Sequence, residues 1–227
     1  INIAINDDNI IEATDEEFTL NIGTITPVQA LSGFIAARIN EDVLTATITD
    51  DDSGVASFDA GTYTVDEDAS GSGNTTLTFN VTMLEGVTPI ASDLTITIPV
   101  TETTLVGAIG GTDFDLPATD VTFAAGMTST TYVVTIINDN IVERDESFNL
   151  ELGTPGQANR AVTSVATLMT GTITNSDQTD LMLAYGVGDN TSGTIVEGAD
   201  TESANFNFVL TLTNPVDGGF DIPYTTA

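Results

Sequence analysis

The side chains able to do chemistry in this sequence are almost all carboxylates. The 227 residues include 34 Asp and Glu against three Arg, with no Lys, His or Cys, and the formal charge is −31. Most general bases, Schiff-base chemistry and transition-metal sites therefore have no residues to use. Carboxylates, hydroxyls, amides and backbone carbonyls remain, and these are the oxygen ligands that hard cations such as Ca²⁺ prefer.

The acids gather in short clusters. Asp7 and Asp8 precede Glu12, Asp50 to Asp52 form a triplet, and Asp139 precedes Glu143 and Glu146. Carboxylates crowded this closely repel one another and resist joint ionisation unless a cation lies between them. The alternative is a solvated face that keeps the protein soluble in salty surroundings. The residue types favour a cation site without deciding between the two.

The same charge balance excludes several classes of partner. Nucleic-acid binding needs clustered Lys or Arg to neutralise phosphates, and anionic membranes attract basic segments. No run of 18 to 20 apolar residues is present, so direct membrane insertion is not expected. An enzyme would have to rest on an Asp/Glu pair, and these pairs are expected on loops that face water, where nothing raises one pKa. We expect no catalysis.

Elements rich in alternating apolar residues must position these acids. The alternation is clear at 76–82, 94–98, 132–136, 148–152 and 206–212, and Gly-, Asn- and Asp-rich turns separate such segments. Alternation indicates strands with one buried face, and 41% hydrophobic residues argue against disorder. Phe79, Phe123, Phe148 and Phe208 lie on the apolar faces and are expected in cores. Several short strands predict an all-β sandwich.

An internal repeat organises the chain. The segment 5–12, Ile-Asn-Asp-Asp-Asn-Ile-Ile-Glu, returns 132 residues later from Ile137, and Asp15 to Phe18 returns 130 residues later as Asp145 to Phe148. Thr45 to Asp50 likewise returns as 170–175, and Ile98-Pro99 as Ile222-Pro223. The repeat predicts three parts: 1–52 is the C-terminal part of one unit, 53–177 a whole unit, and 178–227 the N-terminal part of another. The flanking parts are expected to be completed by further sequence, or else by strand addition from neighbouring molecules.

The marks of the whole unit form a specific set: Thr62 to Glu67, Gly111 to Phe114, Val121 to Gly126, Val134 to Glu146, and an acidic triplet seen intact as Asp50 to Asp52. With these marks the sequence resembles the Calx-beta domain, an immunoglobulin-like sandwich found in tandem. The resemblance covers 53–177 throughout and the flanking parts partially. It implies tandem immunoglobulin-like antiparallel β-sandwiches that bind calcium at one end.

Carried over residue by residue, the resemblance implies a set of metal ligands. In the whole unit these are Glu67, Asp113, Asn138, Asp139, Ile141 through its carbonyl, Glu143, Glu146 and Asp177; in the first part Asp7, Asp8, Glu12, Asp50, Asp51 and Asp52; and in the last part Glu197. Asn138 and Asn175 stand where the family prefers Asp. Each keeps an oxygen but loses a charge, which predicts weaker calcium binding.

The leading functional hypothesis is a non-enzymatic spacer in a long extracellular or cell-surface repeat protein, as in large bacterial adhesins or surface filaments. Its partners are the neighbouring repeats of the same chain and other copies in a filament, and calcium stiffens its joints. The main alternative is a calcium-dependent module that binds carbohydrate or protein. A calcium sensor of the exchanger-regulating kind is the third hypothesis. Each predicts calcium binding, and they differ in what the bound ion does.

Overall fold

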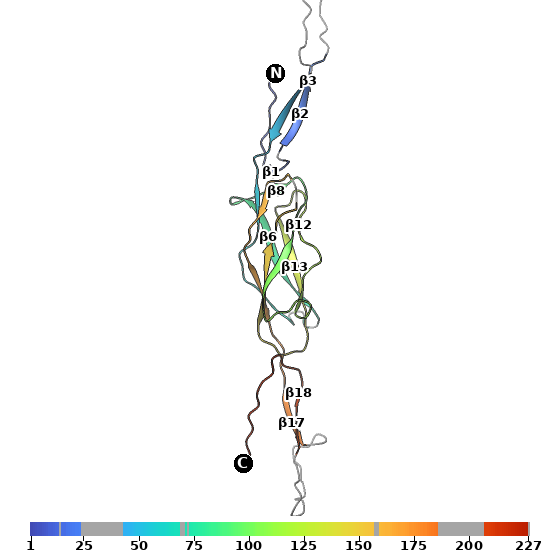
Figure 1. Cartoon of the computed structure of the whole chain (residues 1–227), viewed down its shortest axis with the longest axis vertical. Helices are drawn as coiled ribbons and strands as arrows, with labels where there is room; N and C mark the ends of the chain where they lie inside the picture. The colour runs from blue at the N-terminus through green and yellow to red at the C-terminus, as the bar shows by residue number, and fades with distance from the viewer. Residues whose placement is uncertain are drawn as a thin grey trace, which may run out of the picture.

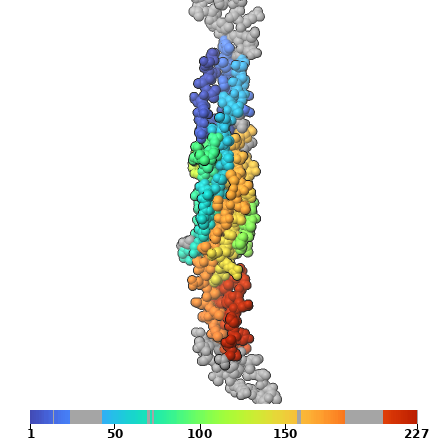
Figure 2. Space-filling model, turned by 90° about the vertical axis from the view of Figure 1, so that its left-hand side faces the viewer, coloured from blue at the N-terminus to red at the C-terminus, as the bar shows by residue number. Residues whose placement is uncertain are grey.

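The structure is a computed structural model that describes residues 1–13, 15–23, 43–68, 71, 73–156, 159–185 and 207–226. Within these residues the chain forms strands and no helix, and hence no helix long and apolar enough to cross a membrane. Three bodies lie end to end along the long axis (Figure 1). The hairpin of β2 (Asp15–Asn21) and β3 (Val43–Thr49) forms one end. The hairpin of β17 (Leu181–Tyr185) and β18 (Phe208–Leu212) forms the other, and a sandwich lies between them (Figure 2).

One sheet of the sandwich follows the order β11-β13-β6-β4-β15. Its strands are β11 (Phe114–Asp115), β13 (Ser129–Ile136), β6 (Thr75–Glu85), β4 (Gly54–Phe58) and β15 (Val162–Ser164), with β7 (Thr88–Pro89) beside β6. The other sheet follows the order β10-β14-β16-β5. It contains β10 (Val100–Val106), β14 (Glu146–Leu152), β16 (Met169–Thr174) and β5 (Tyr63–Asp66). A small pair joins β9 (Ile96–Ile98) to β12 (Val121–Phe123).

The predicted all-β sandwich is confirmed, and among the described strands the pairing is antiparallel except in three strand pairs. β15 runs parallel to β4, and β16 runs parallel to β5. The third parallel pair joins β1 (Ile10–Ile11) to β8 (Ala91–Ser92). The opening strands β4 and β5 belong to opposite sheets, and each lies beside a strand from near the end of the unit. Because β5 and β16 run in parallel, the loops that follow these two strands lie at the same end of the sandwich.

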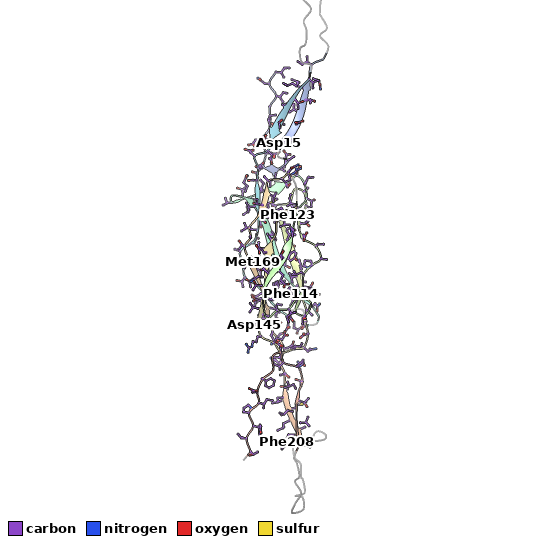
Figure 3. All side chains as sticks on the ribbon, viewed as in Figure 1. Asp15, Phe114, Phe123, Asp145, Met169 and Phe208 are labelled. Carbon is purple, nitrogen blue, oxygen red and sulfur yellow. The ribbon has the colours of Figure 1, made fainter. Side chains whose placement is uncertain are left out.

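The core lies between the two sheets and is rich in aromatic rings. Phe79 and Phe148 are fully buried with ring centroids 6.2 Å apart, and Phe148 stacks on Phe114 at 4.3 Å. Phe123 is 1% exposed, so three of the four predicted core phenylalanines are confirmed. Phe208 is 64% exposed on its hairpin (Figure 3), where the prediction is wrong. A two-stranded ribbon has too little surface to bury both of its faces.

The internal repeat is visible in the strand register. In the sandwich, Phe148 of β14 lies opposite Gly171 of β16. In the first part, Phe18 of β2 lies opposite Ala46 of β3. The sequence repeat pairs Phe18 with Phe148 and Ala46 with Gly171. The β2–β3 pair and the β14–β16 pair are therefore the same element of successive units.

Candidate metal centre

Three carboxylates from distant segments meet at the end of the sandwich that leads to the last part of the chain. Glu67 follows β5, Asp139 lies just after β13, and Asp177 lies just after β16. One oxygen from each lies within 4.8 Å of the others. Because β5 and β16 are parallel neighbours, both strands end at this end of the sheet. We call this set the Glu67 group.

Backbone contacts fix the Glu67 group in place. The Glu67 N–H donates to the Thr174 carbonyl at 3.2 Å, and the Ser176 N–H donates to Glu67 Oε1 at 3.1 Å. Asp139 Oδ1 accepts the N–H of Ile141 at 2.7 Å, which closes the loop after β13. The Glu67 side chain is only 3% exposed. A buried carboxylate is therefore held where water reaches it poorly.

The electrostatics of the Glu67 group are unfavourable without a cation. Burial raises the pKa of Glu67, and the carboxylates of Asp177 and Asp139 raise it further, although the hydrogen bond from Ser176 opposes them. Burial also raises the pKa of Asp177, again helped by Asp139. Within the described residues, Asp177 Oδ2 is a buried oxygen with no hydrogen-bond partner. Such an atom costs free energy unless a donor or a cation meets it.

A second set, the Asp113 group, contains Asp113, Glu143 and Glu146, with one oxygen of each within 4.8 Å of the others. Asp113 precedes β11 and is 7% exposed, and its Oδ2 accepts the N–H of Ile109 at 2.5 Å. Glu146 opens β14 beside Gly107, where an added Cβ would lie 2.9 Å from Glu146 Oε1. Glycine at 107 leaves room for the carboxylate.

The Asp113 group has the most strongly shifted acids. Burial raises the pKa of Glu143 to about 7, and Asp113 adds to the shift. Burial likewise raises the pKa of Glu146 to about 7, again followed by the effect of Asp113. The expectation that loop carboxylates would keep ordinary pKa values is therefore wrong here, because these acids are half-buried and crowded. Asp139 and Glu67 also raise the pKa of Glu143, so the two groups adjoin.

The donor set fits calcium. Calcium takes six to eight oxygen ligands in irregular geometry, and carboxylates can each supply one or two. The two groups offer six carboxylates from four segments at one end of the sandwich. Soft or nitrogen-preferring metals find no thiolate or imidazole in the sequence. An ion placed between the acids would turn their mutual repulsion into attraction.

Two other predicted ligands of the whole unit have different contacts. Asn138 donates its Nδ2 to Asp68 Oδ1 at 3.1 Å and its backbone N–H to Asn74 Oδ1 at 3.3 Å. Its side-chain amide therefore braces the loop after β5. The carbonyl of Ile141 stays a prediction. Asn175, which replaces an acid of the closing triplet, donates its side chain to the Asp177 carbonyl at 3.2 Å.

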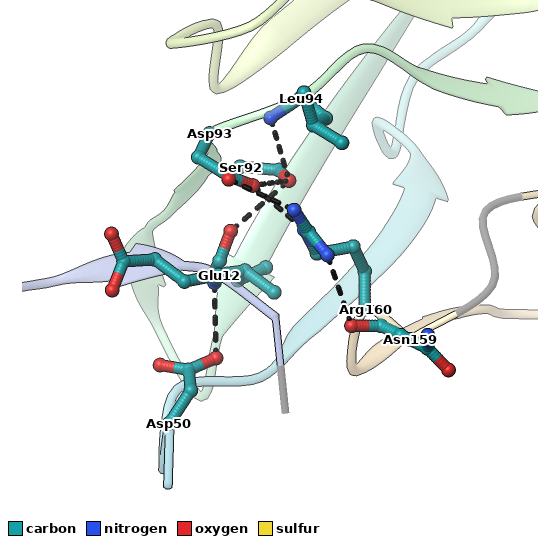
Figure 4. Close-up of polar contacts among 8 residues, drawn as sticks. Glu12, Asp50, Ser92, Asp93, Leu94, Asn159 and Arg160 are labelled. Carbon is teal, nitrogen blue, oxygen red and sulfur yellow. Dashed lines mark hydrogen bonds and ion pairs between the residues drawn. The ribbon is translucent and has the colours of Figure 1, made fainter. Parts of the chain in front are cut away.

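The predicted ligands of the first part gather at the other end of the sandwich. Asp7, Asp8, Glu12, Asp50, Asp51 and Asp52 line a depression of about 380 Å³. Asp8 and Asp52 both accept the Ile10 N–H at 3.1 Å, and Asp50 accepts the Glu12 N–H at 3.0 Å (Figure 4). Burial raises the pKa of Asp52, and the nearby carboxylates of Glu85 and Asp50 raise it further. Glu197 lies outside the described residues.

Some residues near the clusters were not found by sequence reasoning. Glu85 accepts the Ser53 N–H at 3.1 Å and faces Asp52. The charge of Asp217, in the last part, adds to the effect of burial in raising the pKa values of Glu143 and Glu146. The repeat itself held a signal for Asp217, because it stands five residues before Ile222-Pro223, as Asp93 does before Ile98-Pro99. Among the described residues, the ion pair joins Arg160 to Asp93.

Known structures and one family model are similar to this chain. The crystal structure of the apo-form Calx CBD1 domain is 23% identical and covers 56% of this chain and 100% of its own, with a TM-score of 0.43. That of CBD12 from CALX1.2 is 23% identical and covers 54% of this chain and 46% of its own, with a TM-score of 0.42. No curated protein matches the sequence. The family model of the Calx-beta domain matches 1–52 and 49–178, and the chain belongs to the Calx-beta domain family.

Proposed function

We propose that the chain is a non-enzymatic spacer segment of a long extracellular repeat protein, such as a bacterial adhesin or surface filament, and that calcium stiffens its joints. One observation carries the proposal: both carboxylate groups lie at the end of the sandwich where the next repeat begins. Val142, beside Glu143, donates its N–H to the Pro215 carbonyl at 2.9 Å and accepts the Asp217 N–H at 3.1 Å. A cation in the Asp113 group thus lies next to the joint.

The physical effect of calcium follows from the site. The acids of the Glu67 group come from the loops after β5, β13 and β16, and an ion that ligates them ties these loops together. Ion binding stabilises the folded state by mass action, by ~2.7 kcal/mol at a concentration 100 times the Kd. The loop after β13 also contacts 215–217, so fixing it limits the angles available to the next repeat. Stiff joints keep a spacer extended.

Composition and repetition support the extracellular spacer role. Net charge of −31 keeps an extended array soluble and free of self-association. Tandem units that contact only their neighbours suit a stalk rather than a compact body. Raised pKa values at Glu143 and Glu146 are also what a general acid needs. Three carboxylates converging on one point, however, is a ligand arrangement that a cation explains and acid catalysis does not require.

The test compares the chain in calcium and in chelator. We expect calorimetry to show a rise of about 5–10 °C in Tm with saturating calcium. Small-angle scattering should show a narrower range of inter-repeat angles. Magnesium at the same concentration serves as the control for ionic strength and is expected to do less, because it demands octahedral geometry. An unchanged melt and scattering profile in chelator would contradict the proposal.

A further inference from the structure

A side chain of the first part lies in the core of the following sandwich. Ile11 of β1 is fully buried, and its Cδ1 is only 2.7 Å from where a Cβ on Gly54 would lie. Met83 Cγ approaches the same position to 2.9 Å. Because Gly54 has no side chain, a space remains between Gly54 and Met83, which we call the socket. Ile11 fills it from the preceding repeat.

The backbone of Ile11 is fastened to the same sandwich. β1 pairs in parallel with β8, with Ile11 opposite Ser92. The Ile11 carbonyl accepts the N–H of Asp93 at 3.0 Å and the hydroxyl of Ser92 at 3.1 Å. We call this contact of residues 10–12 with 91–93 the first joint.

An ion pair holds the residue that fastens Ile11. Arg160 donates Nε to Asp93 Oδ1 at 2.7 Å and Nη2 to Oδ2 at 2.9 Å, a two-pronged contact (Figure 4). The Arg160 side chain is 9% exposed and the Asp93 side chain 34%, so solvent screens the pair in part. Asp93 and the acids Glu16 and Asp50 of the preceding part raise the pKa of Arg160. A guanidinium therefore supplies positive charge beside the acids of the first part.

The second joint, where 142 meets 215–217, has the same backbone pattern with different side chains. Val142 pairs in parallel with Val216, and the Asp217 N–H donates to the Val142 carbonyl as the Asp93 N–H does to Ile11. Val142 is half-buried, whereas Ile11 is fully buried. Burial and then nearby acids raise the pKa values of Glu143 and Glu146 at the second joint, with Asp217 among the acids, and that of Glu12 at the first joint, with Asp93 among the acids. Asp93 differs in being paired with Arg160. The two joints thus share a register and differ in how charge is balanced.

We infer that the first joint is interlocked without a metal, by the Ile11 side chain in its socket and by Arg160 on Asp93, while the second joint depends on a cation. This inference confines calcium stiffening to the second joint, and only its statement about that joint rests on the proposed function. Apolar burial and a guanidinium–carboxylate pair both persist when divalent ions are removed. Calcium dependence then varies along the array from joint to joint.

The test measures distances across each joint by double electron–electron resonance. The sequence has no Cys, so Thr47→Cys with Thr78→Cys labels the first joint and Thr78→Cys with Thr211→Cys labels the second. In chelator we expect the first pair to keep the distance distribution it has in calcium and the second pair to broaden. Ile11→Ser should broaden the first pair in both conditions, while Ile22→Ser, on an exposed isoleucine, should not.

Arg160→Gln tests the ion pair in a fold that keeps its core. It should broaden the first pair in chelator, and Arg144→Gln, on an exposed arginine, should leave it unchanged. Circular dichroism melts check that the sandwich of each variant is folded; if Ile11→Ser is unfolded, Arg160→Gln alone decides. A first pair that broadens in chelator in the wild type, or that ignores both Ile11→Ser and Arg160→Gln, overturns the inference. A second pair unaffected by chelator contradicts the statement about the second joint and the calcium proposal on which it rests, and leaves the first joint as inferred, so the two failures are distinguishable.

Discussion

The carboxylate of Glu67 and the backbone N–H of Ser176 are joined by a hydrogen bond of 3.1 Å between residues 109 positions apart. The bond ties the loop after β5 to the loop after β16 and orients one oxygen of Glu67. Together with the buried Oδ2 of Asp177, which has no hydrogen-bond partner in the described part of the chain, it marks the place proposed for a cation. Glu67 is therefore the first side chain to change.

Glu67→Gln is expected to have effects of opposite sign in chelator and in calcium. Glutamine keeps an oxygen for the Ser176 N–H but removes a buried carboxylate. Burial already raises the pKa of that carboxyl group, which shows that its charge is unfavourable there. In chelator the variant should melt at the same temperature as the wild type or higher. Calcium affinity should fall at least about tenfold, or ~1.4 kcal/mol. Calorimetry and isothermal titration measure both, with Glu17→Gln, an exposed acid of β2, as the control. Equal affinities in the variant and the wild type would remove Glu67 from the site.

The stability of the metal-free protein should depend on Glu143 and Glu146. Their pKa values rise from 4.5 to about 7 on folding, so the folded state holds more protons than the unfolded state between these values. This contribution to stability is present below pH 4.5 and is lost as pH rises through 7. In chelator, Tm should fall over that window. The double variant Glu143→Gln, Glu146→Gln should show a shallower fall, and a Tm in chelator that rises from pH 5 to 7 would contradict the assignment.

The same acids predict that calcium binding releases protons near neutral pH. Carboxylates must be ionised to ligate the ion, so calcium affinity should rise with pH through 7, opposite to the stability of the metal-free protein. Titration calorimetry at pH 6.5 in two buffers of different ionisation enthalpy gives the number of protons released. The double variant should release fewer. Identical heats in both buffers for the wild type would show that these acids are not ligands.

Sequence patterns predicted the strands and the acids that meet at the end of the sandwich, but not their grouping. Alternation identified the buried face of β6 at Leu77, Phe79 and Val81, because a strand with one buried face has period two. The division between the Glu67 and Asp113 groups depends on which loops leave neighbouring strands, and no local pattern encodes it. The insertion of Ile11 into the next repeat was equally invisible, since Ile10 beside it is the same residue type. Only packing distinguishes it from Ile10, which is 39% exposed.

Asn138→Asp tests the effect of the missing charge in the loop after β13. The Asn138 amide now donates to Asp68, and a carboxylate there would face that acid without a proton to share. We expect a lower Tm in chelator. Calcium should recover more stability than in the wild type, because an added charge beside the Glu67 group strengthens ion binding. Asn80→Asp, on an exposed position of β6, controls for net charge. Calcium affinity equal to that of the wild type would show that Asn138 lies too far from the ion to matter.

Gly171→Ala tests the packing that holds the two sheets together. An added Cβ at Gly171 would lie 2.5 Å from Phe148 Cζ and 3.0 Å from Leu77 Cδ2, and both neighbours belong to the core. The rings of Phe114 and Phe79 flank Phe148, so it has little freedom to move. In the first part, Ala46 stands at the equivalent position opposite Phe18.

We expect Gly171→Ala to lower the free energy of unfolding by ~1–3 kcal/mol, as overpacked cores do. Chemical denaturation in saturating calcium measures the loss without interference from the acidic loops. Gly61→Ala, whose added Cβ would lie 3.5 Å from Tyr63, should change stability little. If both variants unfold like the wild type, Phe148 can shift, and the sheets are less tightly packed around it than the ring contacts indicate.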